Sequence, residues 1–287
     1  MFEVAAMLKV FYHKALDLIQ RRSVVPAFFD VTSRCNLRCP HCYFFRGKQT
    51  ADLTVDEWRE LFTHYRRAHI RHAVLTGGEP TLRPEIITLA DSLFPIVNIA
   101  TNGLIPVAPE IHHTVFISLD GTEETHDRIR GQGTFRKVMD NYHNDRRAIY
   151  RMTINKHNLA EVEPATQAAQ HNGVRGISFI IHAPLDTTDA LCLTPAELEA
   201  VRQTVLGVIR RYGRFVYLTP KMLDAMITSS FGETCKLKGS VALFSDGSPK
   251  KCTMNNIDCR ACKCPTPALL HTYRRDPRGF LLGLKFY

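Results

Sequence analysis

The sequence predicts an α/β protein, a partial (β/α)6 barrel of the TIM type followed by a small cysteine-rich C-terminal domain. Between residues 24 and 231, short apolar segments alternate with segments of helical periodicity, which indicates a parallel sheet with right-handed crossovers. Polar, glycine-rich and cysteine-rich motifs follow directly after several of the apolar segments, at the sheet edge where barrels and open α/β sheets carry chemistry. After residue 231 the periodicity ends and Cys, Gly and Pro become frequent.

The individual strands and helices can be assigned in chain order. Strands are expected at 27–31, 73–75, 96–100, 115–119, 149–154 and 177–181, with 215–218 as a candidate for one more. Helices are expected at 54–65, 84–93, 134–147 and 194–212, with another beginning at 158. Two of them begin with a capping box, Thr54 with Glu57 and Thr194 with Glu197, in which hydroxyl and carboxylate satisfy free backbone amides.

Residues 1–23 are predicted to form a separate amphipathic helix before the barrel. Lys9, His13 and Asp17 form a polar stripe, while apolar side chains face elsewhere. Two interpretations stay open: the helix caps the barrel, or it rests on a membrane surface. The expected domains are therefore the helix at 1–23, the barrel at 24–231 and the cysteine-rich domain at 232–287.

Composition excludes several classes of protein. With 287 residues, 45% hydrophobic and 23% charged, the chain is neither disordered nor fibrous. It contains no run of 18 apolar residues and no secretory signal, so we expect a cytoplasmic protein, with peripheral membrane contact as an alternative. The net charge of +9 fits a basic surface or an anionic partner, but no block of five like charges occurs. Nucleic acid is therefore not an expected partner.

The nine cysteines are the unusual feature of the composition. An odd number without an export signal argues against a disulfide framework and favours metal binding. Three lie near the start and five near the end, and Cys192 stands alone between them, where we expect a small buried hydrophobic residue.

The first cluster has the spacing Cys35-x3-Cys39-x2-Cys42. Three thiolates on one short loop can bind three irons of a cubane cluster, which leaves the fourth iron open to a small molecule. A zinc site is the alternative, but zinc takes four ligands and no fourth lies near in the sequence. Ferredoxin spacing also differs from this motif.

A second motif, Thr76-Gly-Gly-Glu-Pro80, follows the second strand. Together with the cysteine motif it makes residues 24–220 resemble the radical S-adenosylmethionine (radical SAM) superfamily. The resemblance implies a [4Fe-4S] cluster that binds S-adenosylmethionine (SAM) and cleaves it to methionine and a 5′-deoxyadenosyl radical. It also implies a small electron donor such as a flavodoxin or ferredoxin. The loop expected to bind the SAM amino group contains Gly77, Gly78 and Glu79.

Further contacts to SAM are implied by the same resemblance. His41 and Tyr43 flank the third cysteine, where the family places a flat group beside the adenine. Arg130, or Arg128 in the same stretch, could pair with the SAM carboxylate. The polar residues expected at the ribose or carboxylate are Ser118, Asp120 and Asn155.

Thr101 and Asn102 follow the third strand. They either line the same cavity as these residues or only turn the chain.

The C-terminal cysteines indicate a second site of a different kind. Asp246-Gly247 is typical of a hairpin, which would bring Cys235 and Cys252 together, and Cys259-x2-Cys262 would complete four ligands. This pattern resembles the Twitch or truncated SPASM extension of some radical SAM enzymes, which holds one auxiliary [4Fe-4S] cluster. A structural zinc and unligated thiols are the alternatives, and Cys264 could replace Cys262 as a ligand.

The expected function is that of a radical SAM enzyme acting on an unidentified peptide, lipid or small molecule. An auxiliary cluster could accept an electron from a substrate radical and make the reaction oxidative. One alternative is redox-neutral adenosyl transfer to a lipid-like substrate, with a structural C-terminal metal site. The segment after His182, the basic charge and the N-terminal helix resemble enzymes that act on lipids. The other alternative is a non-enzymatic iron–sulfur or RNA-binding protein.

Overall fold

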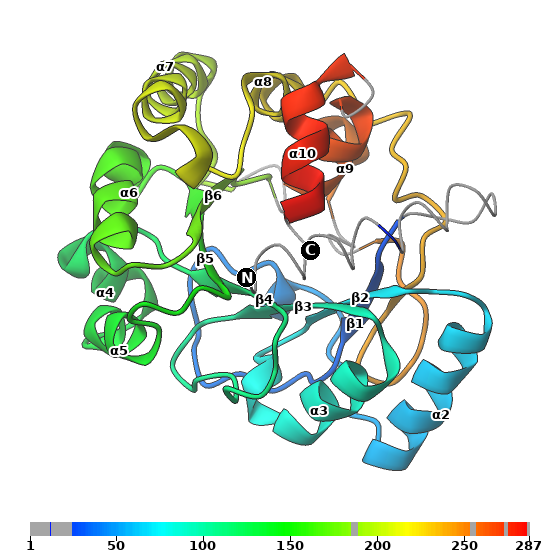
Figure 1. Ribbon diagram of the computed structural model, residues 1–287. Helices are drawn as coiled ribbons and strands as arrows, with labels where there is room; N and C mark the ends of the chain where they lie inside the picture. Colours follow the sequence, from blue (N-terminus) through cyan, green and yellow to red (C-terminus); the bar gives the residue numbers. More distant parts are fainter. Residues whose placement is uncertain (1–11, 13–24, 185–188, 253–256, 273–274, 286–287) are drawn as a thin grey trace.

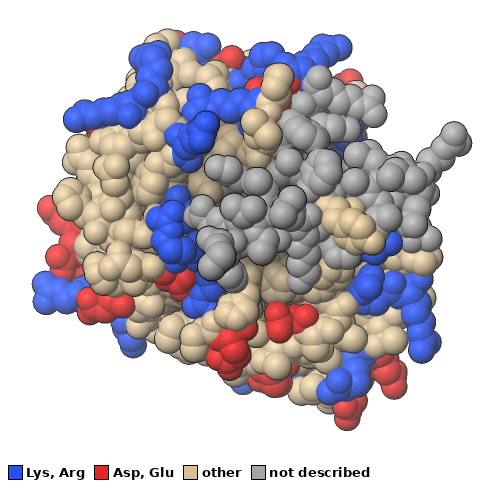
Figure 2. Space-filling view, in the orientation of Figure 1, with Lys and Arg blue, Asp and Glu red and all other residues tan. Residues whose placement is uncertain are grey.

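The computed structural model describes residues 12, 25–184, 189–252, 257–272 and 275–285. The helix predicted at 1–23 lies outside the described residues except for residue 12. Its two interpretations, as a barrel cap or as a membrane contact, therefore lie outside these residues as well. Within the described ranges, no helix is long and apolar enough to span a membrane. On the face seen in Figure 2, Lys and Arg side chains are spread over the upper half and most Asp and Glu side chains lie lower.

A curved, all-parallel sheet of seven strands forms the centre of the molecule (Figure 1). The strand order is β6-β5-β4-β3-β2-β1-β7, so the first six strands follow each other in space as in sequence. This arrangement confirms the predicted α/β fold and its six strands. The strands are β1 (Ala27–Asp30), β2 (His72–Thr76), β3 (Ile96–Thr101), β4 (Thr114–Ser118), β5 (Ala148–Ile154), β6 (Gly176–Ile181) and β7 (Ala242–Leu243).

Helices follow the strands and cover the outer face of the sheet (Figure 1). Both predicted capping boxes are present, at Thr54 and Thr194. The helices are α2 (Val55–Arg67), α3 (Pro84–Leu93), α4 (Glu123–Arg130), α5 (Thr134–Asn141), α6 (Val162–His171), α7 (Pro195–Tyr212), α8 (Pro220–Thr228), α9 (Pro265–Thr272) and α10 (Pro277–Lys285). Short 3-10 helices are η1 (Phe44–Arg46), η2 (Pro80–Leu82), η3 (Leu159–Glu161), η4 (Gly213–Phe215) and η5 (Cys259–Ala261).

An aromatic cluster fixes β1 against the outer helices. The Phe29 ring packs edge-on against Phe62 of α2, with ring centroids 5.1 Å apart, and against Trp58 at 6.1 Å. All three side chains are fully buried. Such pairs contribute about 0.5–1.5 kcal/mol each beyond the burial of their area. They hold the end of β1, from which the first cysteine loop begins.

Both edges of the sheet differ from the sequence expectation, one beside β6 and the other beside β1. At 215–218 only Val216 pairs with the sheet, through a single bridge to Ile177 of β6. The seventh strand is instead β7, which pairs in parallel with β1 through Phe28 and Phe29. Residues beyond 231 thus extend the barrel sheet, while the domain boundary at 231 remains a prediction.

Candidate functional site

A cavity of about 210 Å³ opens at the carboxyl ends of the strands. It brings together residues from the loops after β1, β2, β3 and β6 and from the start of α9. The expected site residues that line it are Cys35, Cys39, His41, Cys42, Tyr43, Gly78, Glu79, Ser118 and Arg130. Thr101 and Asn102 line it as well, so this pair belongs to the cavity wall and does more than turn the chain.

The three N-terminal thiols are partly buried, and hydrogen-bond donors lie beside two of them, Cys35 and Cys39. The backbone N–H of Leu37 donates to Cys35 Sγ at 3.4 Å, and Asn102 Nδ2 lies 3.9 Å from the same sulfur. Arg130 Nη1 lies 3.7 Å from Cys39 Sγ. Burial raises the pKa of the Cys35 and Cys39 thiols, and these donors act in the opposite direction. N–H groups around a sulfur also stabilise the thiolate that a metal cluster requires.

Asp52, remote in sequence, ties down the start of the cysteine loop. Its carboxylate accepts hydrogen bonds from Thr32 Oγ1 at 2.5 Å and from the Ser33 N–H at 2.6 Å. Burial alone would raise the pKa of Asp52, but these two donors hold it below its usual value. The ionised carboxylate therefore fixes the loop immediately before its first cysteine.

The two glycines of the second motif are required by packing against that same loop. The Gly78 N–H donates to Thr32 O at 2.8 Å, and the Glu79 N–H donates to Arg34 O at 2.8 Å. Gly77 has φ +119°, and a Cβ there would lie 2.6 Å from Thr32 O. A Cβ on Gly78 would collide with Arg34 O. The glycines thus bring the backbone of one candidate SAM-binding loop directly against the other.

Glu79 is 1% exposed and is the hub of a hydrogen-bond network. Its Oε1 accepts from the Thr81 N–H at 3.0 Å, from Thr81 Oγ1 at 2.7 Å and from Thr101 Oγ1 at 2.7 Å. Its Oε2 accepts from the Asn102 N–H at 2.7 Å. Three of these donors share Oε1, whereas Oε2 has one, so one of the two acceptor positions on Oε2 is left for a donor from the cavity.

Arg130 connects the cysteine loop to the buried end of β4. Arg130 Nε lies 2.6 Å from Asp120 Oδ2, and His41 Nε2 lies 3.6 Å from the same oxygen. Burial alone would raise the pKa of Asp120, but Arg130 and His41 hold it below its usual value. Burial also lowers the pKa of His41 to about 4, so its imidazole is neutral near pH 7. His41 Nδ1 is buried and has no hydrogen-bond partner among the described residues.

Four of the candidate residues do not line this cavity within the described part of the chain. Asp120 is completely buried behind Arg130 and His41. Arg128 bonds to Thr125 Oγ1 and His157 O, and Asn155 shapes the turn after β5 by accepting from the His157 N–H. Gly77 packs against Thr32 as described above.

A second cavity of about 230 Å³ lies in the barrel interior and shares part of its wall with the first. Arg151 of β5 lies in it, its guanidinium carbon 3.7 Å from the centre of the Phe116 ring. This interior cavity was not predicted from the sequence, although the polar residues at 98 and 151 inside otherwise apolar strands are a signal that could have indicated it. The shared wall consists of Tyr43, Ala100, Ser118, Thr153, Ile180, Cys264 and Pro265.

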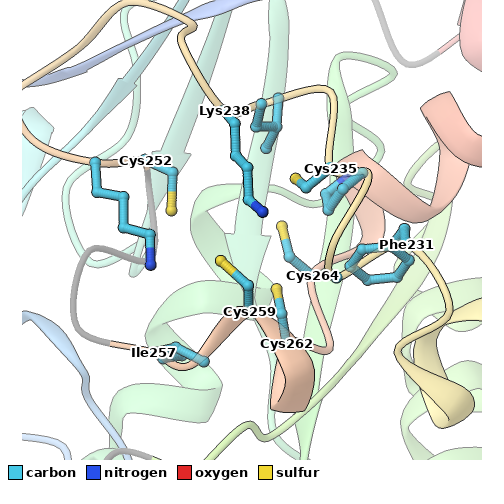
Figure 3. Close-up of a pocket in the computed structure, with 12 residues that line it drawn as sticks. Phe231, Cys235, Lys238, Cys252, Ile257, Cys259, Cys262 and Cys264 are labelled. Atoms are coloured by element: carbon cyan, nitrogen blue, oxygen red, sulfur yellow. The ribbon is translucent and has the colours of Figure 1, made fainter.

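The predicted C-terminal hairpin is present and leads to a separate cysteine pocket. The Gly247 N–H bonds to Phe244 O at 2.9 Å, and the Lys250 N–H bonds to Ala242 O at 2.8 Å. Figure 3 shows cysteine sulfurs from before and after the hairpin facing a shared pocket. The cysteines that line this pocket are Cys235, Cys252, Cys259, Cys262 and Cys264.

Charge and burial in this pocket fit an anionic metal group. Lys238 and Lys251 line it together with the five thiols. A side-chain hydrogen bond to Cys259 raises the pKa of Lys251. Burial raises the pKa of the Cys262 thiol to about 11 and also raises that of Cys264, so thiolates here require a metal or a cation beside them. Cys264 lines this pocket and both barrel cavities.

The cysteine sulfurs of the described residues do not lie at the spacing of a single zinc site. All nine cysteines are described and none is in a disulfide. In the described part of the chain, no three cysteine sulfurs lie within 4.8 Å of one another. Thiolates bound to one zinc, at about 2.3 Å each, would lie closer together than that. Thiolates of a cubane each bind a different iron and lie farther apart. The thiols are therefore not arranged around a single zinc ion in this structure, and both sets offer the donor type that iron–sulfur clusters use.

Comparison with known proteins identifies the barrel. A model of the radical SAM superfamily matches residues 29–191. The sporulation killing factor maturation protein SkfB of Bacillus subtilis is 32% identical over 170 residues, covering 54% of this chain and 40% of SkfB. Pre-heme d1 synthase of Dinoroseobacter shibae is 28% identical over 192 residues, covering 61% of this chain and 48% of the synthase. The chain thus matches less than half the length of either relative.

Among solved structures, anSMEcpe with bound AdoMet and the Kp18Cys peptide has a similar fold. Its TM-score is 0.63 at 15% sequence identity, and the match covers 91% of this chain and 83% of that one. At this identity the likeness concerns the fold alone.

Proposed function

Because the chain belongs to the radical SAM superfamily, we propose that it cleaves SAM at a [4Fe-4S] cluster bound by Cys35, Cys39 and Cys42. When bound, the cluster supplies the electron that breaks the bond between sulfur and C5′ of SAM. The observation that carries this proposal is the convergence of three thiols and Glu79 on one cavity at the active edge of the sheet.

The residues around the cysteines have distinct roles in this proposal. Glu79 Oε2 faces the ammonium group of SAM, for which it has an acceptor position left. His41, neutral and with Nδ1 unsatisfied, lies beside the adenine. Arg130 holds Cys39 and positions the SAM carboxylate, while Asp120 keeps the guanidinium in place. Ser118 and Tyr43 line the passage from this cavity to the barrel interior.

We further propose that Cys235, Cys252, Cys259 and Cys262 bind an auxiliary [4Fe-4S] cluster. The two lysines beside the thiols support an anionic cluster, and a zinc ion with four thiolates is the alternative. A cluster with four thiolate ligands has no open iron, so its part is electron transfer or structural support. A small flavodoxin or ferredoxin is the proposed electron donor to the enzyme.

For the substrate we propose a peptide. SkfB is a maturation protein, and the structurally similar anSMEcpe was solved with a peptide. A peptide side chain could enter the barrel interior, whose cavity shares a wall with the SAM cavity. The second candidate is a tetrapyrrole, favoured by the likeness to pre-heme d1 synthase.

The decisive experiment is SAM cleavage by the anaerobically reconstituted protein. With dithionite and SAM we expect equal amounts of 5′-deoxyadenosine and methionine, measured by liquid chromatography and mass spectrometry. An electron carrier or RNA-binding protein would form neither. Short peptides encoded beside the gene should then be tested for a mass change, with a tetrapyrrole as the competing substrate.

A further inference from the structure

A third group of metal-binding side chains lies at the end of β6, outside both cysteine sets. His182, Asp189 and Cys192 each offer one donor atom, and the three atoms lie within 4.8 Å of one another. His182 Nε2 is 2.9 Å from Asp189 Oδ2. The side chains of His182 and Asp189 are 4% and 1% exposed, respectively. Cys192 is partly exposed, not buried as expected from the sequence. A set with two buried side chains of different types differs from the acidic clusters that are common on protein surfaces.

The backbone holds these donors in place. The His182 N–H donates to Ile154 O of β5 at 2.8 Å, which continues the sheet pairing beyond β6. Asp189 and Cys192 are the ends of one turn, which is closed by a hydrogen bond from the Cys192 N–H to Asp189 O at 3.2 Å. Asp189 Oδ1 accepts from the Leu191 N–H at 3.1 Å, which orients Oδ2 toward the imidazole. Metal sites depend on such outer contacts to orient their ligands.

The types of donor decide which ion suits the site. An imidazole, a carboxylate and a thiolate together suit zinc and neighbouring transition metals, whereas magnesium and calcium prefer oxygen ligands alone. Three protein ligands leave a fourth position on a tetrahedral ion, as in catalytic rather than structural zinc sites. His182 also lines the SAM cavity, so that position is within reach of a ligand in the cavity.

We propose that His182, Asp189 and Cys192 bind a divalent transition metal ion of the zinc class at the wall of the SAM cavity. The fourth coordination position takes water or an oxygen, nitrogen or sulfur atom of the substrate. The ion then serves as an anchor that orients the substrate toward the SAM cavity. This site is independent of the two clusters, since it uses none of their cysteines.

Zinc binding to the full-length protein with reconstituted clusters tests the proposal. The protein is titrated anaerobically with zinc chloride, and bound zinc is counted by mass spectrometry after desalting. We expect about one zinc per chain, displacing any ferrous ion left from reconstitution because zinc binds such sites more tightly. Zinc-edge X-ray absorption should show one sulfur at about 2.3 Å and nitrogen or oxygen ligands at about 2.0–2.2 Å.

Three variants make the result specific. Cys192→Ser should remove the sulfur from the zinc spectrum, and Asp189→Asn should weaken zinc binding at least tenfold. Cys264→Ser, a buried cysteine outside the trio, should change neither. A shell of four sulfurs, or zinc binding that is unchanged in both Cys192→Ser and Asp189→Asn, would overturn the proposal. Iron content and 5′-deoxyadenosine formation, measured without zinc, report separately on folding and on the proposed SAM chemistry.

Discussion

The two cysteine regions of the molecule use the same ligand in opposite ways. In the N-terminal region three cysteines lie on one loop of eight residues and open onto a cavity of about 210 Å³. In the C-terminal region five cysteines from several segments surround a pocket of about 30 Å³. Three ligands at an open cavity leave one iron free to bind a small molecule, whereas four ligands around a small pocket leave none. Under the proposed function, the number of thiols and their access to a cavity therefore distinguish the cluster that binds SAM from the auxiliary one.

The two cysteine regions also differ in the side chains that surround their thiols. In the N-terminal region Leu37 of the loop itself and Asn102 donate to Cys35, and Arg130 donates to Cys39. The C-terminal thiols have two lysines beside them in the pocket. We infer that the first environment positions ligands and the second mainly balances charge.

Removal of the N-terminal thiols should have the largest effect. In the triple variant Cys35→Ala, Cys39→Ala and Cys42→Ala we expect no SAM cleavage and a fall from about eight to about four irons per chain. The remaining cluster should keep the protein brown, and its spectrum should not respond to SAM. 5′-Deoxyadenosine formation at the wild-type rate would contradict the assignment. A colourless variant with about one zinc would instead assign zinc to the C-terminal pocket.

Arg130→Met should affect both stability and chemistry. It leaves Asp120 buried without its cation, which costs about 3–5 kcal/mol in the free energy of unfolding. Thermal unfolding measures this loss, and Arg130→Met with Asp120→Asn should recover part of it. SAM cleavage should stay low in the double variant, because the donor to Cys39 is still missing. Equal stability of wild type and Arg130→Met would show that this pair does not support the cysteine loop.

Much of the barrel and the first cysteine loop could be predicted because their signals are local. Each strand shows its apolar run, and the cysteine spacing lies within eight residues. In contrast, β7 consists of two residues and pairs with a strand more than 200 positions away. Because Asp120 and Asn155 each follow a strand, the sequence placed them at the correct edge of the sheet. It did not predict that their side chains bond to neighbouring residues and do not line the cavity. Asp52 and the trio at His182 were not predicted either, since long-range contacts and a turn bring them into place.

Glu79→Gln should have a smaller effect, confined to SAM binding. A lost charge-assisted hydrogen bond costs about 1.5–3 kcal/mol, so SAM affinity should fall about 10- to 150-fold. Iron content should not change, because Glu79 lies beside the cysteine loop and is not a ligand. Thr101→Val is the matched control: it removes one donor to the same carboxylate but keeps the charge, so SAM affinity should fall much less. Equilibrium binding of SAM to the oxidised protein measures both variants.

The smallest effect on SAM cleavage is expected from the C-terminal pocket. Cys259→Ala should lose about four irons per chain, because a cubane with three ligands in a small pocket is poorly held. With dithionite as reductant it should still form 5′-deoxyadenosine at a rate near that of the wild type, since no cysteine of the N-terminal loop is changed.

Cys264→Ala is the matched control for Cys259→Ala, because it removes a thiol from the same pocket without removing an expected ligand. Burial raises the pKa of both Cys262 and Cys264, but Cys264 is the more deeply buried of the two, so the protonated thiol is favoured more strongly there. The variant should therefore retain about eight irons. Loss of about four irons in Cys264→Ala, with Cys262→Ala unaffected, would exchange the two residues as ligands. Loss of SAM cleavage in Cys259→Ala would break the distinction between a reactive and a supporting region, because the C-terminal pocket would then be required for the first radical step.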